Sequence, residues 1–335
     1  MATRDQLNTD VRAALDALDG REIAHVYLVA CGGSLSIMYP GKYLLDRHAT
    51  RLTSDLYNAD EFICRAPRHL GPKALVILCS QTGTTRETAR AAAFAREQGA
   101  ATIAMTMEPA SPLARAAEHV VRYDAPYTTG NPIDPADSNY AVLYMLLAGL
   151  LDRREGTSLV KPLLSSLPAL APAIAEAKAA FDGRFERFAE RFQDRQVIYT
   201  TASGVNYGAA YSFAICVLME MQWINSQAIH ANEFFHGPFE VVDRAASFIS
   251  LIGLDETRRI EERTRDFLFR FGDAANILVL DAAELDLSRL HEPFRAAFVP
   301  LIFFDALWVF AYKLAARREH VMLEGRRYMK KITDY

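Results

Sequence analysis

The chain has 335 residues, of which 51% are hydrophobic, and its formal net charge is −4. A chain of this size and composition can bury a full core and has room for two ordinary domains. Because no run of lysine and arginine is interleaved with aromatic residues, the sequence argues against a nucleic-acid or acidic-membrane partner and favours a small-molecule ligand.

Residues 1–20 are predicted to form an amphipathic helix. Apolar residues recur at helical spacing from Leu7 to Leu18, and Gly20 follows them, whereas a signal peptide has an unbroken apolar core. The longest apolar run, residues 299–314, is interrupted by Asp305 and is short for a bilayer span. We therefore expect no membrane segment.

The cysteines lie in or beside apolar patterns and lack the spacing of a metal site: Cys31, Cys64, Cys79 and Cys216. They are expected to be reduced thiols in the core of a cytoplasmic protein. Cys31 flanks a glycine turn and is a candidate reactive thiol, although a buried structural role is more common for a free cysteine.

Three segments of the first half recur in the second half at a nearly constant offset. The run HVYLVACGGSLS matches QVIYTTASGVNY, with Gly33 aligned to Gly204 at an offset of 171. Residues 58–62 match 230–234, and residues 85–86 match 257–258, both at an offset of 172. Three matches in the same order indicate two copies of one unit.

Each copy is predicted to alternate strands with helices. In the first copy the strands are expected at 25–30, 51–57, 73–79 and 100–105, with helices that begin near Ser34 and Thr85. Continuously apolar strands separated by helices predict a parallel sheet covered on both faces. We therefore expect an α/β protein with two tandem doubly wound domains related by internal duplication. The predicted boundaries are an N-terminal helix at 1–20, domains at 21–155 and 196–320, a helical linker at 156–195 and a tail at 321–335.

Residues 80–85, SQTGTT, follow an apolar strand and open a helix. Hydroxyls, an amide and free backbone N–H groups converge there, and a helix N-terminus favours an anion. A simple N-cap is the alternative, but capping needs only one hydroxyl. The second copy has Ile-Gly-Leu-Asp-Glu at 252–256, whose carboxylates would repel an anion, so one phosphate site per chain is predicted. Its candidate residues are Ser80, Gln81, Thr82 and Thr85.

The glycine turn at 32–34 ends the first strand and is expected to reach the same carboxyl edge of the sheet. Gly33 and Ser34 are therefore candidates for binding a sugar or phosphate oxygen of the ligand. A plain N-cap is an equally good interpretation of Ser34.

Glu220 is a candidate for proton transfer. It ends a helical pattern inside the apolar run 213–223, and a buried acid without a partner needs a role or a cation. The alternative is a helix-end glutamate that faces water.

His236 is the second candidate for proton transfer, sixteen positions after Glu220 in the segment 220–240. A carboxylate and an imidazole that are both partly desolvated are suited to exchange protons near neutral pH. A core histidine is the alternative interpretation. Glu233 aligns with Glu61 through the repeat, which favours a structural role for both.

The SQTGTT loop, the glycine turn, and EMQW followed by EFFHGPFE resemble the sugar isomerase (SIS) domain family over almost the whole chain, and within it the fructosamine-6-phosphate deglycases. The resemblance implies that the Ser/Thr loop holds a sugar phosphate, that Glu220 is the base and that His236 is the acid. It also implies a homodimer in which these two residues come from different subunits. No metal or redox cofactor is expected.

The isomerase domain of glucosamine-6-phosphate synthase is similar in the same positions. Its ammonia-delivering glutaminase domain is not expected here, because the chain begins Met1-Ala2-Thr3 without the nucleophilic cysteine. In the tail, Lys331 matches the deglycases better and is a candidate to close over the site, with a solvated lysine as the alternative. Arg326, Arg327 and the segment 124–139 are unranked candidates for contacting a substrate carboxylate.

The expected function is hydrolysis of an Amadori compound, a 1-amino-1-deoxyketose 6-phosphate, through an enaminol. Two alternatives remain open. An aldose–ketose phosphate isomerase would use the same acid and base, and a sugar-phosphate sensor would need neither. The identity of the amine moiety is not indicated by the sequence.

Overall fold

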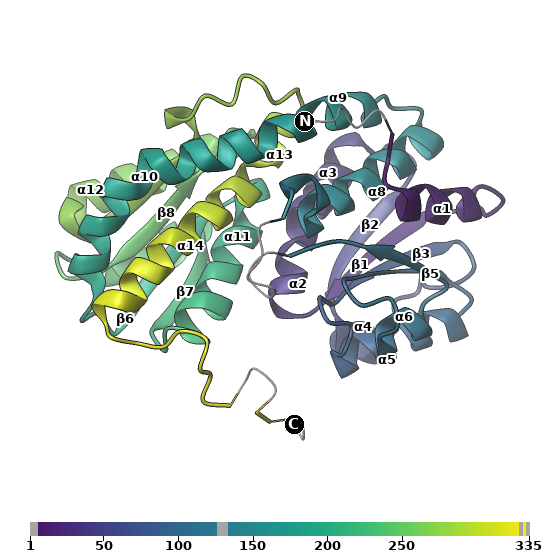
Figure 1. Cartoon of the computed structure of the whole chain (residues 1–335), viewed down its shortest axis with the longest axis horizontal. Coiled ribbons are helices and arrows are strands. Elements are labelled where there is room, and N and C mark those ends of the chain that lie inside the picture. Colours follow the sequence, from purple (N-terminus) through teal and green to yellow (C-terminus); the bar gives the residue numbers. More distant parts are fainter. Residues whose placement is uncertain (1–5, 126–132, 328–330, 333–335) are drawn as a thin grey trace. The chain divides into compact units, whose positions relative to one another are not determined.

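The structure is a computed structural model that describes residues 6–125, 133–327 and 331–332. It divides into two compact units, the first formed by Met1–Ala171 with Ser288–Arg295 and the second by Pro172–Leu287 with Ala296–Tyr335. The division falls inside the segment predicted as a linker. Figure 1 labels the elements.

The first unit is built on a five-stranded parallel sheet with the order β2-β1-β3-β4-β5. Its strands are β1 (His25–Ala30), β2 (Thr53–Asn58), β3 (Ala74–Cys79), β4 (Ala101–Thr106) and β5 (His119–Arg122). Every residue of β1, β3 and β4 is buried, whereas the edge strand β2 is partly exposed. Their continuous apolar sequences fit central strands that are covered on both faces.

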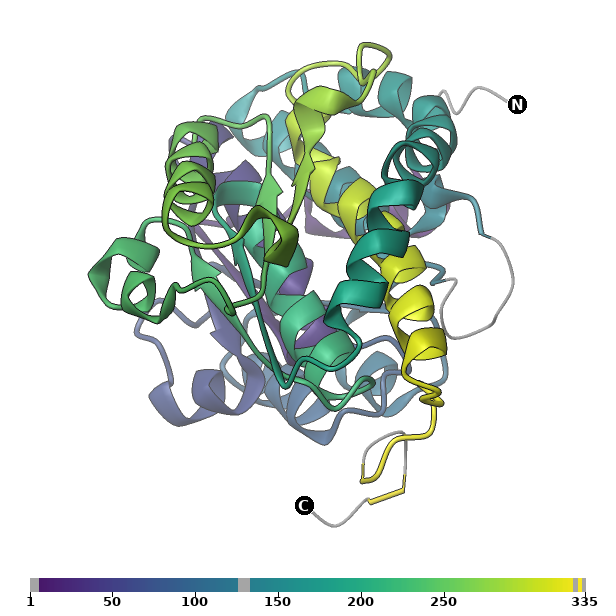
Figure 2. The ribbon, with the colours of Figure 1, turned by 90° about the vertical axis from the view of Figure 1, so that its left-hand side faces the viewer.

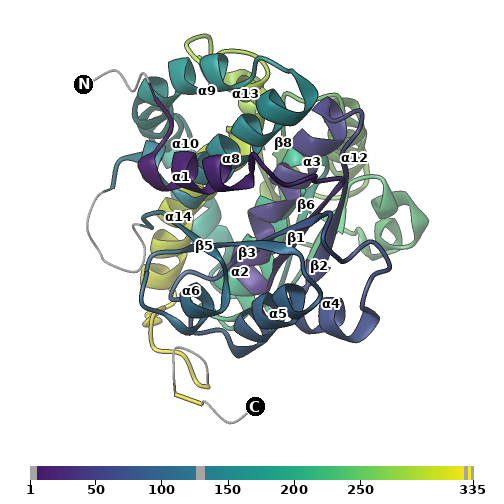
Figure 3. The same ribbon diagram turned by 90° about the vertical axis from the view of Figure 1, so that its right-hand side faces the viewer.

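Helices cover both faces of this sheet, with α4, α5 and α6 on one side and α1, α3 and α8 on the other (Figure 3). The helices are α1 (Thr9–Leu18), α2 (Gly32–Ser36), α3 (Met38–His48), α4 (Ala59–Arg65), α5 (Arg86–Glu97), α6 (Pro112–Ala116), α8 (Asn139–Glu155) and α9 (Val160–Ser166). In α5 the buried residues are Thr88, Ala91, Ala92 and Ala95. That spacing places one stripe of small side chains against the sheet.

The second unit contains a four-stranded parallel sheet with the order β7-β6-β8-β9. Its strands are β6 (Val197–Ala202), β7 (Asn225–His230), β8 (Phe248–Ile252) and β9 (Ile277–Asp281). α12 lies on one side of the strands, and α10 and α14 lie on the other (Figure 2). The helices that belong to this unit or reach into it are α10 (Leu170–Phe192), α11 (Tyr207–Ser212), α12 (Arg258–Phe271), α13 (Phe294–Ala297) and α14 (Val299–Arg317). The fold therefore contains two parallel β-sheets, each covered by helices, as the sequence predicted.

The predicted duplication is present, with one correction to its register. β1 begins at residue 25 and β6 at residue 197, which is 172 positions later. At this offset Gly204 corresponds to Gly32 rather than to Gly33, and both glycines have positive φ, +49° and +53°. The helices α5 and α12 also begin 172 positions apart, at Arg86 and Arg258.

The stretch Phe294–Arg317 is long and apolar enough to cross a membrane, but 78% of its apolar window is buried inside the protein. This burial is typical of a core helix. None of the four cysteines, all of which lie in the described part of the chain, forms a disulfide. Cys79 is buried, whereas Cys64 is exposed, so the expectation of a core position is wrong for Cys64. Burial raises the pKa of the Cys31 thiol, which favours a structural thiol over a reactive one.

Candidate active site

The hydroxyl loop, residues 80–85, leaves the first sheet where its strand order reverses. β1 and β3 are parallel neighbours with Ala30 opposite Cys79, so the chain leaves both strands side by side. Ligands of open α/β sheets bind at such points. Ser34 lies inside α2, which rules out an N-cap, and hydrogen-bonds the Cys79 thiol, whose pKa burial raises to about 11. The predicted phosphate loop and the turn that carries Gly33 and Ser34 are therefore adjacent.

The hydroxyls of this loop are not used to cap the following helix. Thr85 is the N-cap residue of α5, yet its side chain makes no capping hydrogen bond. Its hydroxyl lies 2.9 Å from that of Ser80, and the hydroxyls of Thr82 and Thr84 are 2.7 Å apart. The carbonyl of Gln81 accepts hydrogen bonds of 3.0 and 3.1 Å from donors at the end of β4. This arrangement favours an anion site over the capping interpretation.

Gly83 is the position in the loop where a side chain would not fit. Its φ is +62°, and an added Cβ would lie 2.0 Å from Oγ and 2.4 Å from Cβ of Ser111. We expect Gly83→Ala to displace the loop, to raise KM for a phosphorylated substrate and to lower the free energy of unfolding by roughly 1–3 kcal/mol. Urea titration and substrate saturation measure the two effects.

Gly156→Ala is the matched control for this prediction. Gly156 has a similar φ of +74°, but a Cβ there would meet nothing within 4 Å. Its substitution should therefore cost only the backbone strain, about 1 kcal/mol, and should leave KM unchanged. Equal effects of the two substitutions would show that the contact with Ser111 does not matter.

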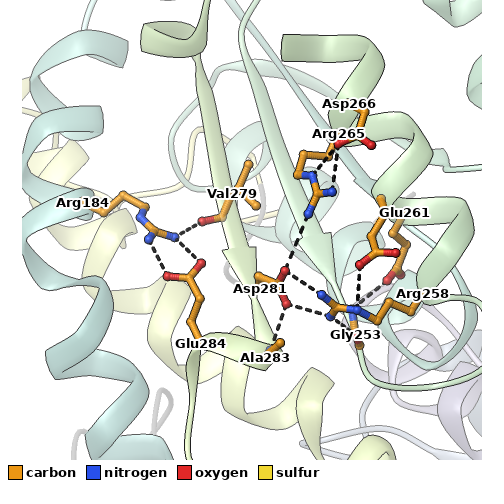
Figure 4. A network of polar contacts seen from close by, with 11 residues as sticks. Arg184, Gly253, Arg258, Glu261, Arg265, Asp266, Val279, Asp281, Ala283 and Glu284 are labelled. Carbon is orange, nitrogen blue, oxygen red and sulfur yellow. Dashed lines mark hydrogen bonds and ion pairs between the residues drawn. The ribbon is translucent and has the colours of Figure 1, made fainter. Parts of the chain in front are cut away.

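In the second unit, carboxylates of the chain itself occupy the corresponding edge of the sheet. Glu261, buried on α12, accepts hydrogen bonds from the backbone N–H of Ser203 after β6 (2.8 Å) and of Gly253 after β8 (2.6 Å). The contact with Gly253 is drawn in Figure 4. Asp255 accepts two further backbone N–H groups, at 2.7 and 3.3 Å. An anion would need these donors, which supports the prediction of one phosphate site per chain. Burial raises the pKa of Glu261 to about 8, although both hydrogen bonds oppose the shift.

Glu220 lies where a widened helix ends. α11 continues into a π-helical stretch, Phe213–Met219, and Glu220 is its C-cap. π-helical turns are uncommon and often occur at functional sites. The Glu220 side chain is half-buried in a pocket of about 300 Å³, so it does not simply face open water. The pocket is lined by Met219, Glu220, Trp223, Ile224, Asn225, Arg326 and Arg327.

The residues between α14 and the C-terminal tail hold the backbone just after this glutamate. Arg318 donates to the carbonyl of Gln222 at 2.7 Å, and Nε2 of His320 lies 2.6 Å from the carbonyl of Met221. The ring of Trp223 packs edge-on against that of His320, with 4.5 Å between centroids. Sequence reasoning missed these residues, because the hydrogen-bonded partners are 96 and 99 positions apart and no local pattern signals them.

Burial raises the pKa of Glu220 to about 7. Below that pH the group is protonated, and only the carboxylate can accept a proton from a substrate. We therefore expect kcat/KM to rise roughly tenfold per pH unit up to about pH 7 and to level off above it. A profile of kcat/KM against pH from 5 to 9 measures this rise and the plateau above it. A rise centred near the ordinary glutamate pKa of about 4.3 would contradict the burial of the Glu220 carboxyl.

His236 lies at the other end of β7 from Glu220. Glu220 precedes the amino end of this six-residue strand, and His236 follows its carboxyl end in the 3-10 helix Glu233–His236. The strand alone spans about 17 Å at about 3.3 Å per residue. His236 is exposed in the single chain, and its role in proton transfer stays a prediction. Within the described part of the chain, no hydrogen bond or ion pair joins the candidate acid and base, and β7 lies between them along the sequence.

The remaining candidates lie mainly in the tail. Lys331 is exposed, and its role stays a prediction. Arg326 and Arg327 line the pocket of Glu220, which distinguishes them from the other proposed carboxylate contacts. Residues 126–132 of the candidate segment 124–139 lie outside the described part of the chain.

Comparison with known proteins identifies the family. Residues 21–149 match the SIS domain. Over 327 residues the chain is 46% identical to the fructosamine deglycase FrlB of Bacillus subtilis, and the match covers 98% of each protein. The chain belongs to the SIS-domain family, among its fructosamine deglycases. This SIS protein is also 29% identical over 325 residues to the fructoselysine 6-phosphate deglycase of Escherichia coli, with 97% of this chain and 91% of the relative covered.

A solved structure supports the fold of this SIS protein. A crystal structure from Bacillus subtilis matches it with a TM-score of 0.93 and 45% identity, and the match covers 98% of both chains. The family and the tandem α/β fold expected from the sequence are thereby confirmed.

Proposed function

We propose that this protein hydrolyses a fructosamine 6-phosphate to glucose 6-phosphate and a free amino acid. The observation that carries the proposal is the half-buried carboxyl of Glu220, whose pKa burial raises to about 7, inside a pocket large enough to admit part of a substrate. A base of this kind suits abstraction of a carbon-bound proton at neutral pH. The names of two full-length relatives, a fructosamine deglycase and a fructoselysine 6-phosphate deglycase, agree with this chemistry.

The proposed reaction begins with the open-chain ketone form of the substrate. Glu220 takes a proton from C1, which lies between the amine and the C2 carbonyl, and the carbonyl oxygen gains a proton to give an enaminol. A proton then returns to C2 and leaves a C1=N iminium. Water adds to C1, the C1–N bond breaks, and the amine departs as C1 becomes an aldehyde. One water is consumed and no electrons are exchanged with another molecule.

The other predicted residues bind or position the substrate in this proposal. The hydroxyl loop binds the phosphate group, and the turn with Gly33 and Ser34 binds the sugar. Binding energy from the unreactive phosphate then helps to orient the reacting carbon. His236 moves protons during ring opening, and Lys331 closes over the bound sugar.

The proposal includes a homodimer, in which Glu220 acts with the partner's His236. Its support is that the two residues lie at opposite ends of β7 within one chain and that His236 is exposed there. A second copy would both supply the missing acid and bury it. Two-fold symmetry then gives two identical sites, each made from both chains.

Exposed apolar side chains near both residues fit such an interface. Beside Glu220, Met219 and Trp223 are 45% and 37% exposed. On the side of His236, Phe271 of α12 is 48% exposed and packs against Phe267, which contacts Phe235 next to His236. Large apolar groups that gather on a surface often mark a contact with another protein.

Incubation with fructoselysine 6-phosphate and, separately, with fructose 6-phosphate tests the proposed function. Release of lysine and glucose 6-phosphate from the first compound is the expected result. Turnover of fructose 6-phosphate alone would identify an isomerase instead, and binding of either compound without turnover would identify a sensor. A panel of fructosamine 6-phosphates made from other amino acids guards against a wrong choice of amine.

A further inference from the structure

Two arginines line the pocket of Glu220, and the proposed proton transfer uses neither of them. Arg326 and Arg327 line it together with Glu220 and Asn225. Across residues 6–125, 133–327 and 331–332, no carboxylate lies within ion-pair distance of either guanidinium. Two arginines without an acidic partner, in one pocket with an amide, are suited to bind a carboxylate or a phosphate.

Arg326 has a defined orientation in this pocket. Its Cζ atom lies 3.9 Å from the ring centroid of Trp223, which is the geometry of a cation–π stack. Stacking uses the face of the guanidinium and leaves the N–H groups along its edge free for a ligand. Trp223 has a φ of +56°, a backbone conformation that a bulky residue adopts only where its surroundings impose it.

The tail that carries the two arginines is anchored just before them. Arg318 and His320 contact the backbone carbonyls of Gln222 and Met221, next to the catalytic glutamate. Met322, which is buried, receives a hydrogen bond from the amide of Gln222 at 3.1 Å. Such anchoring reduces the entropy lost when the arginines bind a ligand.

We propose that Arg326 and Arg327 bind the carboxylate of the amino acid moiety of the substrate. This inference rests on the proposed function, in which Glu220 acts at C1. The amino acid is attached to C1, whereas the phosphate is attached to C6 at the far end of the sugar. The anion that reaches arginines in the pocket of the base is therefore the carboxylate. The apolar side chains of Met219 and Ile224 in the same pocket provide a surface for the carbon atoms of the amino acid.

The test uses pairs of substrates that differ only in this charge. One pair is fructosyl-alanine 6-phosphate and its alaninamide analogue; the other is Nε-fructosyl-lysine 6-phosphate and its lysinamide analogue. For the pair that the wild type turns over, Arg326→Gln and Arg327→Gln should raise KM for the carboxylate form by roughly tenfold or more. KM for the amide form should change by less than about twofold, because the lost charge has no partner there. Arg326→Lys, which keeps the charge but loses the planar fork, should be intermediate.

Arg65→Gln is the matched control, since Arg65 is also an exposed arginine stacked on an aromatic ring, 5.1 Å from that of Tyr57 in the first unit. It should change neither KM. Equal losses on the acid and amide substrates in the Arg326 and Arg327 variants would overturn the carboxylate contact and leave the deglycase proposal intact. If the wild type turns over neither pair, the same comparison is made on the member of the fructosamine 6-phosphate panel that it does turn over; absence of turnover on the whole panel would instead remove both proposals.

Discussion

Glu220→Gln is expected to lower kcat by roughly 10²- to 10⁴-fold, which is the usual contribution of a general base. Glutamine keeps the size of the side chain and its hydrogen-bonding oxygen, but it cannot accept the C1 proton. The fold should survive, because Glu220 is half-buried and its pKa is raised by burial alone, so its charge costs free energy in the folded state. Steady-state kinetics with the best fructosamine 6-phosphate measures the loss.

The stability of the same variant gives an independent measurement. A folded-state pKa of about 7, above the ordinary glutamate value, means that ionisation disfavours the folded state. The wild type should therefore lose unfolding free energy as the pH rises from about 4.3 through about 7, whereas Glu220→Gln should lack this component. Urea midpoints at several pH values show the difference. Identical pH dependence in both proteins would mean that the carboxyl is not buried in solution.

Glu233→Gln is the matched control for the kinetic prediction. Glu233 lies in the same segment of the sequence, but it is exposed and follows β7. Glu233 shares the 3-10 helix of His236 but is not the proposed base, so its substitution should lower kcat by less than about tenfold, far less than the loss expected for Glu220→Gln. If Glu233→Gln were as inactive as Glu220→Gln, the assignment of the base would be wrong.

Mixing two inactive proteins, Glu220→Gln and His236→Ala, is expected to restore activity. In a heterodimer one shared site would contain both substitutions and the other would contain neither. Random assortment makes half of the dimers mixed, and each has one intact site of two, so about a quarter of the wild-type activity should return. Co-expression or joint refolding allows the subunits to exchange, and size-exclusion chromatography confirms the dimer.

The control for this experiment pairs Glu220→Gln with a chain that carries both substitutions. No combination of those chains creates an intact site, so their mixture should stay inactive. If the mixture of single variants also stays inactive while mixed dimers form, then Glu220 and His236 do not share a site across subunits.

Much of the fold follows from local patterns in the sequence. The apolar runs in β1, β3 and β4 predict buried central strands, because a parallel sheet covered on both faces has no polar side. The repeat predicts that α12 begins as α5 does, and both helices follow a threonine N-cap. Residue identity aligns Gly204 with Gly33, which is wrong by one position. The positive φ of Gly32 and Gly204 identifies Gly32 as the equivalent turn residue, and a sequence does not reveal φ.

The candidate site is less predictable, because its environment is made by distant parts of the chain. Local sequence places Glu220 in an apolar helix, but the half-buried pocket depends on a tail about a hundred residues later. Similarly, the sequence shows that Asp255 would repel an anion. It does not show that the buried Glu261 accepts hydrogen bonds from the backbone N–H groups of Ser203 and Gly253, because these contacts join separate elements.

The sequence by itself determined the tandem α/β architecture, the hydroxyl loop and the identity of the carboxyl and imidazole candidates. These depend on periodicity and residue type, which are local properties. Only the tertiary structure decided that Glu220 shares a pocket with Arg326 and Arg327, and that His236 lies exposed at the far end of β7. Burial and proximity arise when segments distant in sequence pack together, so no local pattern contains them.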